Sequence, residues 1–155
     1  MVNIMFVCLG NICRSPMAEF LMKDYVAKRG ASDMFRIASA ATGTETEGDG
    51  VHSGTKQVLE SKGIDCSQKR AVKLKKADYD KFDYFVGMDE SNRRSMVRLF
   101  GGDPAHKVSL ILDYTDHPRD VADPWFTGNF DKTREDIENG IEGLYRYLRE
   151  NAFKA

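Results

Sequence analysis

The chain has 155 residues, 41% of them apolar and 30% charged, and this size and composition are typical of a single globular domain over residues 1–155. A formal net charge of −1 gives no support to a nucleic-acid partner, and no apolar run approaches the ~20 residues that would place the chain in a membrane. Three cysteines, an odd number, and a short N-terminal apolar run without a basic lead-in favour the cytoplasm over a secreted, disulfide-bonded protein.

The first predicted unit is a strand, a tight loop and a helix. Val2–Cys8 is apolar with β-branched members, which is typical of a buried strand. A loop that contains a glycine follows, and Ser15 and Pro16 then suit the N-cap and the first position of a helix. We expect this helix to continue, with apolar residues at helical spacing, until Gly30 ends it.

The rest of the chain is predicted to alternate further strands and helices. Strands are expected at 35–38, 84–88 and 108–112, and helices at 52–62, at 91–100 and from about Asp131 onward. Segment 43–50 is predicted to be a surface loop, because it has three glycines and no apolar period. Segment 113–129 is predicted to be a long loop, and long loops in compact domains are usually functional or disordered.

Strands that alternate with helices predict an α/β fold with right-handed crossovers between parallel strands. We expect a three-layer αβα arrangement in which a central, twisted sheet of four parallel strands carries helices on both faces. In such sheets the ligand site lies beyond the carboxyl ends of the strands. Cys8, Ser39 and Asp89 are each predicted at such an end, so three chemically useful residues are expected at one edge of the sheet.

The loop between the first strand and the first helix carries the strongest chemical signal. At a helix N-terminus several backbone N–H groups point at one spot, and the helix dipole adds positive character. These donors would stabilise a thiolate at Cys8, and with Arg14 as a planar, two-pronged donor they would also bind a dianionic phosphate. The alternative is that Cys8 is a buried core cysteine, which is usual for this residue type but leaves Arg14 and Gly10 without a comparable explanation.

The run from Val7 to Glu19, VCLGNICRSPMAE, resembles the phosphate-binding loop of low-molecular-weight protein tyrosine phosphatases. The resemblance covers most of the chain and implies an enzyme without metal or cofactor that hydrolyses phosphotyrosine in proteins, and aryl phosphates, through a phosphocysteine intermediate. Cys8 would be the nucleophile and Arg14 the phosphate binder, with inorganic phosphate and similar oxyanions as inhibitors. The implied phosphate-binding residues are Leu9, Gly10, Asn11, Ile12, Cys13, Arg14 and Ser15. The three histidines, at 52, 106 and 117, have no metal-ligand spacing.

The departing phenolate needs a proton, so an acid is expected opposite the nucleophile. Asp123 precedes Pro124, which restricts it to extended geometry, and Trp125 and Phe126 would form the walls of a cleft around a phenyl ring, together with Ile12. In the resembling family an Asp-Pro followed by two aromatic residues, usually tyrosines, supplies the general acid and base. The alternative is a turn whose aromatic residues cap the core.

Two other acids, Asp116 and Asp120, lie in the same loop without a flanking aromatic wall. A basic run in the middle of the chain is interpreted as a solvated face; its members are Lys69, Arg70, Lys73, Lys75 and Lys76. Gln68 stands in this run where some relatives carry a histidine, which leaves the contribution of a histidine in doubt.

Four residues are assigned supporting roles: Asn11, Ser15, Ser39 and Asp89. Asn11 tolerates the left-handed backbone that a curled loop requires, and the resemblance implies a hydrogen bond from it to Ser39. Ser15 is suited to donate its hydroxyl to the Cys8 sulfur, with simple N-capping as the compatible alternative. Asp89 lies in a Met-Asp-Glu-Ser-Asn run that matches the family, and its alternative role is a helix N-cap.

Cys13 has two interpretations. It lies five residues from Cys8 across the curled loop, where it would form a reversible disulfide that shields the nucleophile from further oxidation. The alternative is a packing role.

Three other functions are weighed against the tyrosine phosphatase. Thioredoxin-coupled arsenate reductases resemble this fold but need two further cysteines, and only Cys66 remains. Bacterial protein-arginine phosphatases are also similar, but they favour a smaller polar residue at the position of Ile12. A non-catalytic phosphotyrosine-binding module is disfavoured by the presence of Cys8, Arg14 and Asp123 together.

Overall fold

The computed structural model describes residues 1–153 of the chain. Four strands alternate with five α-helices in the order β1 (Val2–Cys8), α1 (Arg14–Ala27), β2 (Phe35–Ala41), α2 (Ser53–Ser61), β3 (Tyr84–Gly87), α3 (Glu90–Phe100), β4 (Val108–Leu110), α4 (Pro124–Thr127) and α5 (Phe130–Asn151). Three short 3₁₀ helices complete the set, namely η1 (Ser32–Met34), η2 (Lys76–Asp80) and η3 (Ile111–Tyr114).

The four strands form one sheet in the order β2-β1-β3-β4, and each neighbouring pair is parallel. Val2 lies opposite Phe35 at the start of the β1–β2 pair, and Cys8 lies opposite Ala41 at its end. Parallel neighbours require crossover connections, which the intervening helices supply. The predicted four-stranded parallel α/β sheet is therefore confirmed.

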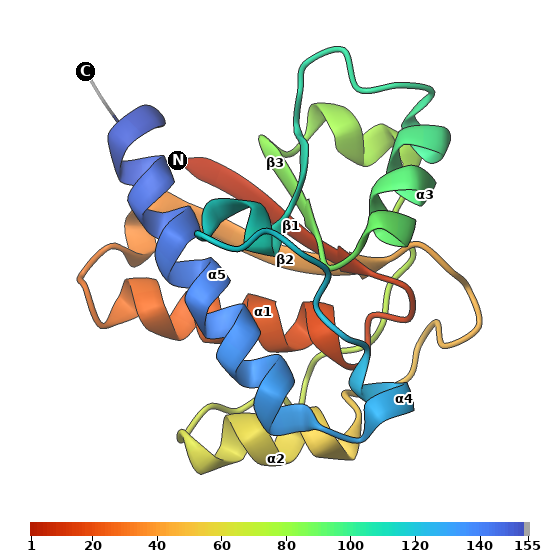
Figure 1. Ribbon diagram of the computed structural model, residues 1–155, viewed down its shortest axis with the longest axis vertical. Helices are drawn as coiled ribbons and strands as arrows, with labels where there is room; N and C mark the ends of the chain where they lie inside the picture. Colours follow the sequence, from red (N-terminus) through yellow and green to blue (C-terminus); the bar gives the residue numbers. More distant parts are fainter. Residues whose placement is uncertain (154–155) are drawn as a thin grey trace.

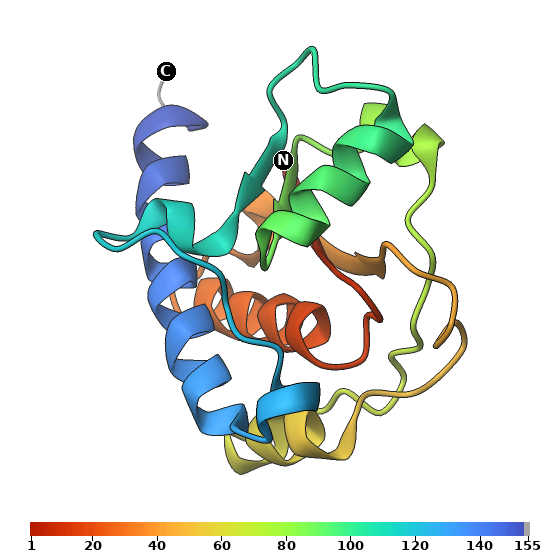
Figure 2. The same ribbon diagram turned by 45° about the vertical axis from the view of Figure 1, so that its right-hand side comes forward.

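Helices cover both faces of this sheet, as Figures 1 and 2 show: α1 and α5 lie on one face and α3 on the other. Side chains alternate along β1 in the same way. Ile4 and Phe6 pack in the cluster that contains residues of α1 and α5, whereas Met5 and Val7 pack in the cluster that contains residues of α3. The predicted three-layer arrangement is confirmed, and none of the described helices is both long and apolar enough to cross a membrane.

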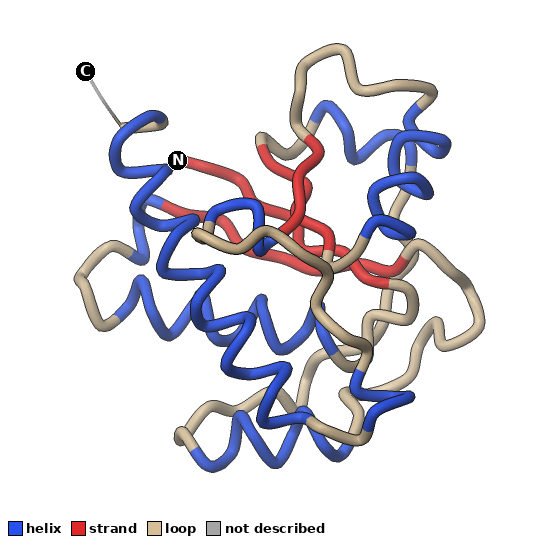
Figure 3. Tube along the Cα trace, viewed as in Figure 1, coloured by secondary structure: helices blue, strands red, loops and turns tan. Residues whose placement is uncertain are grey.

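The connections that follow the carboxyl ends of the strands gather beside the start of α1 (Figure 3). They include segment 9–13 after β1, segment 42–52 after β2 and the chain that precedes α4. The order of the strands therefore brings together segments that are more than a hundred residues apart.

Several predicted boundaries are wrong. α1 begins at Arg14 with Cys13 as its N-cap, so Ser15 is in the first turn and is not the cap. α1 ends at Ala27, before the turn that Gly30 closes with φ 67°. β2 is longer than predicted, and Ser39 lies within it, opposite Phe6, rather than at its end.

The fourth strand and the long loop also differ from the prediction. β4 ends at Leu110 because the Asp113 carboxylate accepts the Leu110 N–H at 2.9 Å and turns the chain into η3. The predicted loop 113–129 contains part of η3 and the short helix α4. α5 begins one residue earlier than expected, where Asn129 caps it by accepting the N–H of Lys132.

Two glycines of α5 let the backbone of η3 approach the helix closely. A methyl group on Gly143 would overlap the carbonyl of Tyr114, and one on Gly140 would overlap the side chain of Ile111. We expect Gly143→Ala to lower the free energy of unfolding by about 3 kcal/mol, because the overlap with fixed backbone outweighs the helix propensity of alanine, which is worth about 1 kcal/mol. Urea unfolding would measure this loss.

Asn139→Ala is the matched control, because Asn139 is an exposed residue of the same helix. That variant should be as stable as the parent or slightly more stable. A Gly143→Ala midpoint at or above that of the parent would contradict the close approach of η3 and α5.

Candidate active site

Cys8 ends β1 with its sulfur inside a ring of donors. Sγ accepts the backbone N–H of Asn11 at 3.3 Å and that of Ser15 at 3.4 Å, and it lies 3.0 Å from the Ser15 hydroxyl. The residue is only 3% exposed. Three hydrogen-bond donors thus converge on one sulfur.

The carbonyl groups of the loop are held from outside the ring. Five of them accept hydrogen bonds from surrounding segments: Cys8 from Thr42 N, Leu9 from Gly43 N, Gly10 from Thr46 Oγ1, Ile12 from His52 N, and Cys13 from Thr55 Oγ1. In a planar trans peptide the N–H points opposite to the C=O, so each outward carbonyl turns the next N–H inward. The loop thus presents a set of backbone donors to the space in front of the sulfur.

Asn11 holds the loop in this shape. Its backbone is left-handed, with φ 56°, as predicted for the curled loop, and its side chain is buried. Oδ1 accepts the N–H of Val72 at 3.1 Å, while Nδ2 donates to Ser39 Oγ at 2.9 Å and to Ser15 Oγ at 2.8 Å. One side chain therefore joins the loop to β2 and to segment 70–74.

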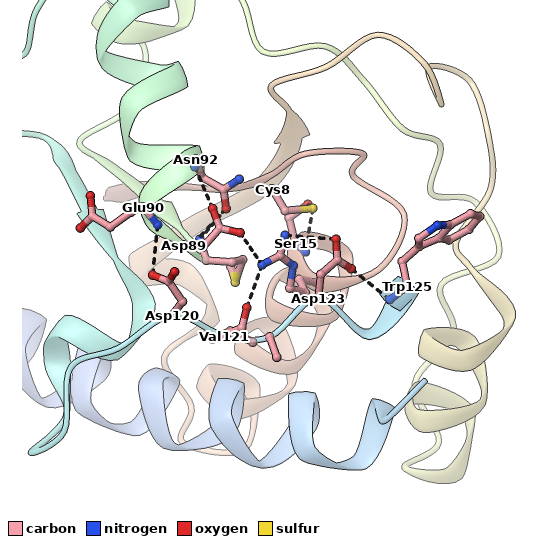
Figure 4. A network of polar contacts seen from close by, with 12 residues as sticks. Cys8, Ser15, Asp89, Glu90, Asn92, Asp120, Val121, Asp123 and Trp125 are labelled. Carbon is pink, nitrogen blue, oxygen red and sulfur yellow. Dashed lines mark hydrogen bonds and ion pairs between the residues drawn. The ribbon is translucent and has the colours of Figure 1, made fainter. Parts of the chain in front are cut away.

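Arg14 lies at the start of α1 and is 3% exposed. Its NH1 group donates to the Asp89 carboxylate and to the Val121 carbonyl, both at 2.8 Å, and NH2 lies 3.5 Å from Asp123. These three partners, Asp89, Val121 and Asp123, lie close together in Figure 4. Both N–H bonds of NH1 are thereby used, which leaves Nε–H and most of NH2 for an oxyanion.

Asp89 makes two kinds of contact. One oxygen accepts the backbone N–H of Asn92 at 2.9 Å and so caps α3, and the other binds Arg14. Asn92 returns the contact by accepting the N–H groups of Met88 and Asp89. The cap fixes the carboxylate, and the carboxylate in turn fixes the guanidinium.

Asp123 is the N-cap of α4 and lies across the pocket from the loop. Its backbone is extended, with φ −77° and ψ 114°, as the following proline requires, and Oδ1 accepts the Trp125 N–H at 3.0 Å. The second oxygen faces Arg14.

The segment before Asp123 is anchored at three points. Arg119 makes a two-pronged ion pair with the buried Asp136 of α5, at 2.7 and 3.0 Å. Asp120 accepts the N–H of Glu90 at 3.1 Å, and Val121 N donates to the Met88 carbonyl at 2.9 Å. Asp120, one of the two rival acids, is therefore used in this anchor.

The other rival, Asp116, lines a separate pocket beside α5. The same pocket is lined by Asp136. Burial alone would raise the pKa of Asp136, but hydrogen bonds and charges from Arg119 and Lys132 lower this pKa below its usual value. Of the three candidate acids, Asp116, Asp120 and Asp123, only Asp123 lines the pocket in front of Cys8.

That pocket has a volume of about 220 Å³. Its lining is formed by the loop, by segment 43–46 and by the start of α4: Cys8, Leu9, Gly10, Ile12, Cys13, Arg14, Gly43, Glu45, Thr46, Asp123, Trp125 and Phe126. Trp125 and Phe126 are 60% and 80% exposed, so their rings are available to a ligand. The pocket is thus charged and rich in donors at its floor and apolar at its walls.

His52 supports the Trp125 wall, a contact that the sequence did not suggest. Its ring meets Trp125 edge-on at 5.5 Å between centroids and stacks on Phe130 at 5.1 Å. The same residue caps α2, and its backbone N–H binds the Ile12 carbonyl. No spacing in the sequence links these residues, so only the fold reveals the contact.

Cys13 is the second thiol of the pocket. Burial, with further contributions from Cys8 and Asp123, raises its pKa to about 12. It therefore stays protonated at neutral pH.

Lys69 was wrongly grouped with the solvated basic run. Its side chain is 13% exposed, and Nζ donates to the Ser39 carbonyl at 2.9 Å and lies 3.4 Å from Glu19. Gln68 is exposed. Lys69 and its carboxylate partner are 50 residues apart in sequence, so no spacing along the chain suggested that they pair.

The arrangement fits a tetrahedral oxyanion held by backbone N–H groups and a guanidinium. The Cys8 sulfur lies at the floor, a carboxyl group lies at the rim, and apolar walls would take the group that the oxyanion carries. These are the components of transfer of a phosphoryl group to a thiolate.

Comparisons with known proteins agree with this chemistry. A family model described as low molecular weight phosphotyrosine protein phosphatase matches residues 3–154. The low molecular weight protein-tyrosine-phosphatase YfkJ of Bacillus subtilis is 38% identical over 146 residues, which cover 93% of this chain and 94% of YfkJ. The crystal structure of YfkJ matches with a TM-score of 0.93 and 36% identity, covering 97% of this chain and 96% of that one.

Two further relatives differ in the phosphorylated residue that their names state. PtpA of Staphylococcus epidermidis, also a low molecular weight protein-tyrosine-phosphatase, is 34% identical over 152 residues, 98% of this chain and 97% of PtpA. A structure of the arginine phosphatase YwlE matches with a TM-score of 0.84 and 27% identity, covering 97% of each chain.

Proposed function

The chain belongs to the low molecular weight phosphotyrosine protein phosphatase family, and we propose that it hydrolyses phosphotyrosine in proteins through a phosphocysteine on Cys8. The observation that carries the proposal is the convergence of Asn11 N–H, Ser15 N–H and the Ser15 hydroxyl on one sulfur, with Arg14 and Asp123 facing it across the same pocket.

In the first step the Cys8 thiolate attacks phosphorus in line with the bond to the phenolic oxygen. The new S–P bond forms as the P–O bond breaks, and protonated Asp123 gives its proton to the departing oxygen.

In the second step a water molecule attacks phosphorus and gives a proton to the Asp123 carboxylate. The S–P bond breaks, its electron pair returns to sulfur, and inorganic phosphate leaves. Arg14 and the inward N–H groups stabilise the equatorial oxygens in both steps, and most of the catalysis of phosphoryl transfer comes from such contacts. Ser15 donates to the sulfur as it regains its charge.

Cys13 is proposed to protect the nucleophile. Oxidation of the Cys8 thiolate by a peroxide would give a sulfenic acid, which the Cys13 thiol would convert to a disulfide with loss of water. Both cysteines are free and buried in the structure and line one pocket.

The apolar wall of the pocket supports tyrosine over arginine as the phosphorylated residue. Ile12, Trp125 and Phe126 offer contact to a phenyl ring. Among the described lining residues, only Glu45 and Asp123 carry a carboxylate that could pair with a guanidinium.

A pair of peptides that differ only in phosphotyrosine or phosphoarginine tests the substrate. We expect kcat/KM to be at least about 100-fold higher for phosphotyrosine, because an apolar pocket discriminates by the burial of the ring. Ile12→Thr should lower this ratio by about tenfold, since it removes apolar contact and adds a hydroxyl.

A phosphoarginine peptide turned over as fast as the phosphotyrosine peptide would overturn the choice of substrate. Thioredoxin oxidation that depends on arsenate would instead support a reductase. Absence of any turnover with p-nitrophenyl phosphate would indicate a binding module.

A further inference from the structure

Glu19 is a buried carboxylate of α1 that lies behind the loop and does not line the pocket. Its Oε1 accepts the Ser39 hydroxyl at 2.5 Å and lies 3.4 Å from Lys69 Nζ, while Oε2 accepts from Lys23 Nζ at 2.6 Å. A carboxylate that is 5% exposed is costly to keep unless it is paired and hydrogen-bonded.

The two lysines reach Glu19 in different ways. Lys23 approaches from solvent, one turn along the same helix, and its side chain is 45% exposed. Lys69 comes from a distant segment and is 13% exposed, and it also donates to the Ser39 carbonyl. Of the two lysines, only Lys69 therefore links the Glu19 carboxylate to the backbone of β2.

The donor and acceptor of each hydrogen bond in this network follow from the two groups at its ends, the Val72 N–H and the Glu19 carboxylate. Val72 N–H donates to Asn11 Oδ1, so Asn11 Nδ2 must be the donor to both Ser39 and Ser15. Ser39 accepts from Asn11 and can place its own hydrogen only on the Glu19 carboxylate.

The same reasoning sets Ser15. Its oxygen accepts from Asn11, so its hydroxyl hydrogen is left for the Cys8 sulfur, 3.0 Å away. The part of the chain that the structure describes has no buried side-chain nitrogen or oxygen without a partner, so every member of the network is fixed.

We propose that Lys69 and Glu19 are a positioning pair that acts through Ser39 and Asn11 to keep the Ser15 hydroxyl aimed at the Cys8 sulfur. The inference rests on the proposed function, because it assigns the pair a role in the breakdown of the phosphocysteine. Neither residue touches the substrate. The pair holds Asn11 Nδ2 in place, and Asn11 Nδ2 in turn holds the Ser15 oxygen.

The pair matters most in the second step. There the S–P bond breaks and its electron pair returns to sulfur, and a well-aimed Ser15 hydroxyl stabilises the thiolate that leaves. In the first step the same donor stabilises the thiolate before it attacks, which does not speed the attack. Loss of the pair should therefore slow hydrolysis of the phosphocysteine more than its formation.

The test compares Lys69→Met with Lys23→Met, which removes the other lysine from the same carboxylate. p-Nitrophenyl phosphate is the substrate, because its good leaving group makes phosphocysteine hydrolysis limit kcat, whereas kcat/KM reports formation of the intermediate. We expect Lys69→Met to lower kcat about tenfold, the value of one charged hydrogen bond, and kcat/KM less than about threefold.

The control and a rescue complete the design. Lys23→Met should keep both parameters within about twofold, as expected for a largely exposed ion pair. Lys69→Arg should restore kcat to within about threefold of the parent, because it retains the charge and the donors. The amplitude of the nitrophenolate burst counts intact sites, so rates are compared per folded enzyme even if a variant is less stable.

Each outcome decides between the alternatives. A Lys69→Met kcat within about twofold of the parent, or equal losses in kcat and kcat/KM, would overturn the positioning role. Equal losses would indicate a general distortion of the loop instead. If the parent enzyme itself shows no turnover and no burst, the proposed function fails, and that result is distinct from an active parent with an unaffected variant.

Discussion

Cys8→Ser is expected to lower the turnover of p-nitrophenyl phosphate by on the order of 10⁴-fold or more while phosphate binding persists. A serine hydroxyl would have to lose its proton before it could attack phosphorus at a useful rate. In the proposed mechanism, by contrast, Cys8 attacks as a thiolate that is already deprotonated. The proposed donors to the oxyanion are backbone N–H groups and Arg14, and the substitution leaves them in place. Steady-state kinetics and calorimetric titration with inorganic phosphate would measure the two quantities.

Cys66→Ala is the control for this variant. Cys66 is also a buried cysteine, but it does not line the pocket. Its loss should leave kcat unchanged. A Cys8→Ser enzyme that keeps activity within about tenfold of the parent would show that Cys8 is not the nucleophile.

Asp123→Asn should slow the reaction to a degree that depends on the leaving group. Asparagine can still cap α4 by accepting the Trp125 N–H, so the loop keeps its shape while the transferable proton is lost. We expect phosphorylation of the enzyme by phenyl phosphate to fall about 10²–10⁴-fold, the range of general acid catalysis, and that by p-nitrophenyl phosphate to fall least. The measurement is kcat/KM for a series of aryl phosphates plotted against the acidity of the phenol.

Asp116→Asn is the matched control, since this exposed acid of the same long segment lines another pocket. It should leave the dependence on the leaving group unchanged. A loss in Asp123→Asn that is uniform across the series would argue against an acid role and for a role in binding.

Features that depend on residues close together in the sequence were the easiest to predict. The alternation of strands and helices predicted the parallel α/β fold, and the local pattern of a buried strand, a curled loop and a helix start predicted the position of Cys8 and Arg14. Asp123 was singled out because the proline that follows it and the two aromatic residues are adjacent in sequence. All three residues line or face one pocket in the structure.

Residues that act through distant contacts were missed. Lys69, Glu19 and Val121 reach the site from segments whose relation depends on the order β2-β1-β3-β4, and no spacing along the chain encodes it. A basic run usually faces solvent, which misled the interpretation of Lys69.

The errors in element boundaries have local causes. Ser15 is a good N-cap by type, but its hydroxyl is engaged with the Cys8 sulfur and with Asn11, and the helix begins before it. β4 is short because Asp113 turns the chain, and α4 is too short to show a period. Residues that carry chemistry and residues that end helices are of the same types, so sequence alone could not separate the two roles.

Trapping the covalent intermediate tests the central claim most directly. The enzyme is quenched in acid during turnover of p-nitrophenyl phosphate, digested, and the peptide that contains Cys8 and Cys13 is analysed by mass spectrometry. We predict one phosphoryl group on the sulfur of Cys8, in an amount that matches the nitrophenolate burst. Rapid turnover with no phosphoryl group on that peptide, or with the group on another residue, would contradict the account.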